Sequence, residues 1–128
     1  MTKHELRQIV YNKYMGKCAY TGKPLGDDWQ IDHAESKYLS ILRHTWENVN
    51  DICNLEPVIS IVNHYKRAKD IEMFREYMLT FHIRLSKLPK KTLVDATVNR
   101  INYMNRIAEL FDITPDKPFC GKFYFETL

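Results

Sequence analysis

The sequence predicts an α+β domain with helices on either side of a short β-containing region. Three observations predict this class. Apolar residues recur at helical spacing near the start and through the second half, two β-prone pieces flank the turn-rich TGKPLGDD, and 128 residues with 45% hydrophobic content suit one compact fold. We expect a single domain over residues 1–128, with a core at about 17–69 and a helical extension at about 70–128.

The first element expected is a helix near the start of the chain. In HELRQIVYNKYMG, Leu6, Ile9, Val10 and Tyr14 recur at helical spacing, and Gly16 suits a helix terminator. A hairpin should follow, because KCAYTGKPLGDDWQID holds two short β-prone pieces around Gly, Pro and Asp residues.

The middle of the chain contains a segment without a secondary-structure signal, followed by a clearly predicted helix. Residues 35–53 show no clean period, and a stretch of that size without regular structure is often functional. After NLEP, the run VISIVNHYKRA predicts a helix whose apolar face consists of Val58, Ile61, Val62 and Tyr65. The other face carries Asn63, Lys66 and Arg67.

Two longer helices and a terminal strand are expected in the second half. The run DIEMFREYMLTFHIRLSKL repeats the helical pattern, with Asp70 as its N-cap and Pro89 beyond its end. Another periodic stretch runs from Thr92 to Phe111 and stops before TPDKP. The closing KFYFE predicts a short strand.

Composition limits the function classes. A net charge of +3 and a pI near 8.7 allow a polyanionic partner without requiring one. No apolar run is long enough to span a membrane and MTKHELRQIV does not resemble a secretory signal, so we expect a cytoplasmic protein with no membrane partner. The three separated cysteines predict reduced thiols.

The adjacent Asp32 and His33, in WQIDHAESK, raise a geometric question. Neighbouring side chains of a regular strand point to opposite faces, so this pair should not share one small site. We therefore expect the strand to end at Asp32 and the chain to bend at His33, which would let both side chains converge.

An ordered set of short segments resembles the HNH endonuclease family: KCAYTGKPL, IDH, NLEP and NHYKR. The resemblance covers about residues 17–69, and it implies a ββα-metal core in which a hairpin and a helix hold one divalent cation. The implied activity is metal-dependent hydrolysis of DNA phosphodiester bonds. RNA stays an alternative substrate, because both polymers present the same phosphate.

The resemblance also implies roles for individual residues. Asp32 and Asn63 match the ligands of the metal, Mg²⁺ or Mn²⁺, with His64 as the alternative to Asn63. His33 matches the general base that takes a proton from water, and Asn54 matches the asparagine that clamps nearby backbone and orients the base.

Four basic residues are candidates for contacting nucleic-acid phosphates. Lys66 and Arg67 follow Asn63 by three and four residues and should share its side of the helix, while Lys37 and Arg43 are weaker candidates.

The chain departs from many relatives, which frame this site with two C-x-x-C pairs that bind zinc. The matching positions here are Cys18 and Thr21, then Ile59 and Val62. One thiolate does not hold a structural zinc, so we expect none, with an apolar cluster in its place.

Two other function classes remain open. A non-catalytic nucleic-acid-binding module on a degenerate HNH scaffold would bind without hydrolysis, and a protein-interaction domain would do neither. Salt-sensitive DNA binding is expected of the nuclease and of the binding module but not of the protein-interaction domain, so it separates that class from the other two. The sequence leaves the oligomeric state and the cleavage specificity open.

Overall fold

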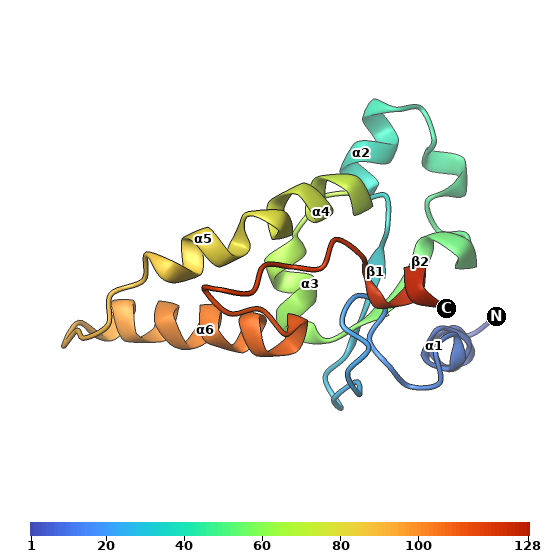
Figure 1. Ribbon diagram of the computed structural model, residues 1–128. Helices are drawn as coiled ribbons and strands as arrows, with labels where there is room; N and C mark the ends of the chain where they lie inside the picture. Colours follow the sequence, from blue (N-terminus) through green and yellow to red (C-terminus); the bar gives the residue numbers. More distant parts are fainter. The chain divides into compact units, whose positions relative to one another are not determined.

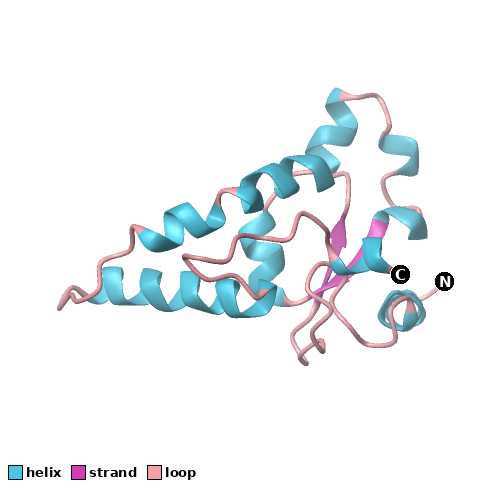
Figure 2. Cartoon of the chain, in the orientation of Figure 1, coloured by secondary structure: helices cyan, strands magenta, loops and turns pink.

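A computed structural model describes residues 1–128 (Figure 1). The elements in chain order are α1 (Lys3–Asn12), β1 (Gln30–His33), α2 (Lys37–Leu42), η1 (Trp46–Asn48), η2 (Ile52–Asn54), β2 (Leu55–Val58), α3 (Ser60–Lys66), α4 (Ile71–Leu79), α5 (Phe81–Ser86), α6 (Asp95–Phe111) and η3 (Tyr124–Thr127), where η marks a 3-10 helix. The chain is mainly helical and contains one two-stranded antiparallel sheet (Figure 2), which confirms the α+β class.

The chain divides into two compact units. Residues 1–74 and 123–128 form the first unit, and residues 75–122 form the second. The predicted core at about 17–69, with the sheet and the helix that follows it, lies entirely in the first unit.

The helix starts follow local capping chemistry. The Thr2 hydroxyl accepts a hydrogen bond from the Glu5 amide at 3.1 Å, and the Glu5 carboxylate accepts one from the Thr2 amide at 3.1 Å, so a capping box starts α1. Asp70 accepts from the amide of Met73 at 2.8 Å, which confirms it as the cap of α4.

The predicted hairpin is wrong in its pairing. Strand β1 pairs antiparallel with β2, and Asp32 lies opposite Glu56. The preceding segment forms only an isolated bridge between Lys17 and Pro24, and the amide of Ala19 donates to the carbonyl of Pro57 at 2.8 Å. The backbone hydrogen bonds of this preceding segment are therefore made within its own tight turn and to β2.

Three further boundaries differ from the predictions. The strand continues through His33, which pairs with Leu55, so it does not end at Asp32. The predicted long helix after Asp70 is split into α4 and α5 at Thr80. The terminal KFYFE does not form a strand: Tyr124–Thr127 forms the 3-10 helix η3, in which the amide of Glu126 donates to the carbonyl of Phe123 at 3.0 Å.

An aromatic cluster fills the core of the first unit. Tyr20 lies edge-on to Phe74 and Phe123, with ring centroids 5.5 and 5.1 Å apart, and the rings of Phe74 and Phe123 stack at 5.2 Å. All three side chains are buried. The cluster fixes the position of Tyr20, whose hydroxyl reaches the sheet.

The second unit consists of the C-terminal part of α4, the helices α5 and α6, and an irregular segment (Figure 1). Its buried apolar side chains are Met78, Phe81, Leu85, Met104, Ile107, Ala108, Leu110, Ile113 and Phe119. The αL conformation of Asp112, at φ 57°, ends α6. Across the whole chain, no helix has the length and apolar character that a membrane crossing requires.

Candidate functional site

The two faces of β1 carry different chemistry. Side chains alternate along a strand, so Gln30 and Asp32 share one face and Ile31 and His33 share the other. Helix α3 covers the Asp32 face, where Lys66 contacts the carboxylate. The expected convergence of Asp32 and His33 on one face is therefore wrong, because His33 keeps its place in the strand ladder.

Asp32 belongs to a buried polar cluster. Its Oδ2 atom accepts a hydrogen bond from the Tyr20 hydroxyl at 2.6 Å and lies 3.0 Å from the Nζ atom of Lys66. The same ammonium group donates to the carbonyl of His33 at 3.3 Å. Burial raises the pKa of the Asp32 carboxyl, while the charge of Lys66 and the hydrogen bond from Tyr20 oppose that rise.

A second buried carboxylate lies directly across the ladder. Glu56 accepts a hydrogen bond from Lys13 Nζ at 2.9 Å, and that ammonium also donates to the carbonyls of Ile52 and Leu55 at 3.1 and 2.9 Å. Each carboxylate thus has its own lysine, which offsets the cost of burying two like charges side by side. Sequence reasoning missed both residues: Glu56 lies inside the NLEP segment but had no role assigned to it, and Lys13 belongs to no motif.

Asn54 ties together the segments on either side of the site. Its Oδ1 atom accepts from the Glu35 amide at 2.8 Å, and its Nδ2 atom donates to the carbonyls of Glu35 and Val49 at 3.1 and 2.7 Å. The Ala34 amide also donates to the carbonyl of Asn54 at 2.9 Å. The amide therefore clamps backbone immediately after β1, as expected, but it does not touch the His33 ring.

Asn50 makes the ring contact that was expected of Asn54. The Nε2 atom of His33 lies 3.0 Å from the Oδ1 atom of Asn50. Because Oδ1 only accepts, this arrangement places the ring proton on Nε2 and leaves the lone pair on Nδ1. Asn54 holds the backbone of Val49, the neighbour of Asn50, and so acts on the His33 ring only indirectly, through Val49 and Asn50.

His33 lies in a cleft between α1 and the sheet, which we name the His33 cleft. It is lined by Lys3, Leu6, Arg7, Ile31, His33, Asn50 and Leu55 and has a volume of about 460 Å³. No carboxylate lines it. Two basic side chains, an imidazole and an amide therefore face a space whose remaining walls are aliphatic.

The other predicted metal ligand lies on the α3 side of the sheet. Asn63 is half-buried, and its Nδ2 atom donates to Oε1 of Gln30 at 2.7 Å. His64, the alternative ligand, is exposed. The helix register thus directs Asn63, and not His64, toward β1.

The predicted phosphate-contacting residues occupy different environments. Lys66 is fully buried in its ion pair, so its expected place on an open helix face is wrong. Arg43 pairs with Glu35 and Asp70 at 3.2 and 2.8 Å. Arg67 and Lys37 are exposed.

The donor atoms suit a hard divalent cation in kind. A carboxylate from Asp32 and an amide oxygen from Asn63 are ligand types that Mg²⁺ accepts, with water and phosphate oxygens completing the shell. Both oxygens of the Asp32 carboxylate are already bonded, Oδ2 to Tyr20 and Lys66 and Oδ1 to Lys66 at 3.4 Å, so a metal ion would bind there only by displacing the Lys66 ammonium. No group of three or more His, Cys, Asp or Glu side chains that could hold a metal ion is present.

The positions that match the zinc cysteines are largely apolar. Cys18 and Val62 are buried, and Thr21 and Ile59 are half-buried. The absence of a structural zinc stays a prediction.

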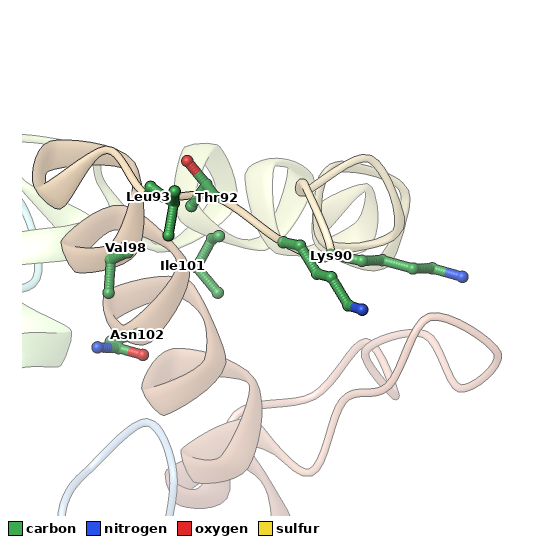
Figure 3. Close-up of a pocket in the computed structure, with 7 residues that line it drawn as sticks. Lys90, Thr92, Leu93, Val98, Ile101 and Asn102 are labelled. Atoms are coloured by element: carbon green, nitrogen blue, oxygen red, sulfur yellow. The ribbon is translucent and has the colours of Figure 1, made fainter.

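A hollow in the second unit has different chemistry. It lies where the α5–α6 connection meets α6 and is lined by Lys90, Lys91, Thr92, Leu93, Val98, Ile101 and Asn102 (Figure 3). It contains neither an imidazole nor a carboxylate. The His33 cleft therefore has the stronger set of groups for catalysis.

Comparison of the chain with models of protein families, with curated proteins and with solved structures found no match.

Proposed function

We propose that the chain is an HNH-type endonuclease that hydrolyses DNA phosphodiester bonds with the help of one divalent cation. The observation that carries the proposal is the order of elements along the chain, β1, β2 and then α3. His33 is the last residue of β1, while Asn63 and Lys66 of α3 contact Gln30 and Asp32 on the other face of that strand. The asparagine clamp after β1 adds support, because it holds the strand end that bears His33.

His33 is the general base in this proposal. Its Nε2–H donates to Asn50, so the Nδ1 lone pair is free to take a proton from the water that attacks phosphorus. Asn50 keeps the ring in this tautomer and orientation. The ring lies beside Lys3 and Arg7, whose charges favour an anionic substrate.

Asp32 and Asn63 are the residues that would hold the cation. They lie on the α3 face of the sheet and His33 lies on the opposite face. The substrate phosphate would therefore bridge the two faces at the His33 end of β1, and the cation would displace the Lys66 ammonium from the Asp32 carboxylate. A bound Mg²⁺ or Mn²⁺ would supply charge stabilisation at the phosphate and at the leaving oxygen. Lys66 is a positioning residue here, since it contacts both the Asp32 carboxylate and the backbone carbonyl of His33.

Cleavage of supercoiled plasmid tests the proposal. We expect nicked or linear product with Mg²⁺ or Mn²⁺, none with EDTA, and a loss of about 10²- to 10⁴-fold in rate for His33→Ala. His44→Asn is the matched control, because His44 is exposed and has φ 57°, a conformation that asparagine tolerates. Cleavage that survives in His33→Ala contradicts the assignment.

The ion pair of Asp32 with Lys66 favours a second candidate, a non-catalytic nucleic-acid-binding module. In that case the lysine permanently replaces the metal at the carboxylate. This module binds DNA with normal salt dependence but gives no cleavage with any divalent cation. The plasmid assay and a binding assay on the same preparation therefore separate the two candidates.

A further inference from the structure

We propose that the His33 cleft is the binding site for the nucleic-acid backbone and that Lys3 and Arg7 of α1 bind its phosphates. This inference rests on the proposed function, which it deepens by assigning a binding surface outside the segments that resemble the HNH family. Neither residue belongs to the four basic candidates taken from the sequence.

The first argument is charge. Lys3 and Arg7 are one helical turn apart on α1, so both side chains lie on the same side of that helix. They line the cleft with His33 and Asn50, and no acidic side chain lines it. A phosphodiester placed there meets hydrogen-bond donors on several sides and no like charge.

The second argument is that Arg7 is held in place. Its guanidinium carbon lies 3.9 Å from the centroid of the Trp29 ring, and its Nη2 atom donates to the Trp29 carbonyl at 3.1 Å. One of five N–H donors is used in that bond, so the planar group keeps others for a phosphate. Because Trp29 directly precedes β1, the same contact ties α1 to the strand that carries His33.

The third argument is the mixed lining. Leu6, Ile31 and Leu55 give the cleft aliphatic walls, whereas the charged groups are half-buried or exposed. A sugar–phosphate chain has the same mixture, with apolar sugar faces between anionic groups. A volume of about 460 Å³ admits a short piece of such a chain.

A fluorescence-anisotropy titration tests the assignment. The probes are a labelled 20-base-pair DNA duplex, the single DNA strand and an RNA of the same sequence, with EDTA present so that no cleavage occurs. We compare the full chain with a double variant, Lys3→Gln with Arg7→Gln, from about 50 to 200 mM salt.

The matched control removes two charges elsewhere. The variant Lys90→Gln with Lys91→Gln removes an equal amount of positive charge, two units, from the exposed connection between α5 and α6 in the second unit. We expect the cleft variant to lose about tenfold or more in affinity, with a salt slope smaller by about 1.8 on duplex DNA, and the control to keep the wild-type slope. Equal losses in both variants, or no loss in the cleft variant, overturn the assignment.

Lys3→Gln alone guards against a folding artefact. Lys3 is the first residue of α1, where a positive charge opposes the helix dipole, so its removal should not weaken the helix. We expect this single variant to lower the salt slope by about 0.9. A slope unchanged in Lys3→Gln and in Arg7→Gln, with both folded, overturns the proposal.

The three probes identify the polymer. Loss of affinity in any of the three supports the cleft and shows whether it takes DNA, RNA or both. Loss of binding in the cleft variant without any cleavage by the wild type supports the cleft and contradicts the nuclease. Cleavage that depends on His33 but not on Lys3 or Arg7 supports the nuclease and contradicts the cleft.

Discussion

The Nζ atom of Lys66 lies 3.0 Å from Oδ2 of Asp32, and these side chains are 0% and 7% exposed. This pair joins the last turn of α3 to β1 inside the first unit. It also explains why Lys66, which the sequence places on a polar helix face, is not available to solvent. Removing one partner should cost more than removing both, because a lone buried charge has no counterion.

Lys66→Met should lower the free energy of unfolding by about 3–5 kcal/mol, since it leaves the Asp32 carboxylate without its cation. Adding Asp32→Asn in the same chain should recover most of that loss. Urea unfolding followed by tryptophan fluorescence measures both effects, and both tryptophans lie in the first unit. A loss below about 1 kcal/mol for Lys66→Met would show that the pair is exposed in solution.

Asn54→Ala should destabilise the first unit by about 2–3 kcal/mol, because it removes three side-chain hydrogen bonds and leaves backbone groups of Glu35 and Val49 unpaired. Asn48→Ala is the control, since Asn48 is exposed in η1. The same urea titration compares them. Similar midpoints for the two variants would contradict the clamp.

Asn50→Ala should reduce kcat of the proposed cleavage reaction by about tenfold or more while KM stays close to the wild-type value, because the residue orients His33. Steady-state cleavage of a labelled duplex separates the two constants. A change confined to KM would assign Asn50 to substrate binding instead.

Stability should fall as the pH rises above about 10, because two tyrosines resist ionisation in the folded chain. Burial, and then the hydrogen bond and charge of Glu56, raise the pKa of Tyr14, while burial and the charge of Asp32 raise that of Tyr20 well above 10.0. The pKa of each tyrosine is higher in the folded chain than in the unfolded chain. The stability that these two tyrosines contribute is therefore fully present below about pH 10 and is lost as the pH rises toward the folded pKa.

Absorbance at 295 nm across the alkaline range measures this effect, with circular dichroism as the measure of folding. Tyr14→Phe should remove one late-ionising group and make the loss of stability with pH shallower. If all tyrosines of the wild type ionise together near their usual pKa, both environments are exposed in solution.

Gly22→Ala should destabilise the first unit by at least about 2 kcal/mol, because φ is 71° and an added Cβ would lie 2.5 Å from Cδ1 of Tyr124. The effect has two parts, backbone strain and the ring clash. In a Tyr124→Ala background only the strain remains, so the same substitution should cost about 1–2 kcal/mol. Equal costs in both backgrounds would remove the clash as a cause.

Local sequence patterns determined several features of this chain. Helical spacing predicted α1, α3 and α6 to within a few residues at either end, because a helix is specified by neighbours three and four positions apart. Asp70 as a cap follows from the same local chemistry. The backbone clamp of Asn54 and the choice of Asn63 over His64 were expected from the resemblance of NLEP and NHYKR to a family motif, and the structure shows the clamp and directs Asn63 toward β1.

Only the tertiary structure decided which strands pair and what surrounds His33. A four-residue β-prone run carries no record of its partner, so β1 pairs with β2 across more than twenty residues and not with its near neighbour. Extending the strand by one residue keeps Asp32 and His33 on opposite faces. The burial of Lys66 and the contacts of Asn50 and Arg7 arise from segments far apart in the sequence, because ion pairs and stacking depend on distance in space and leave no period along the chain.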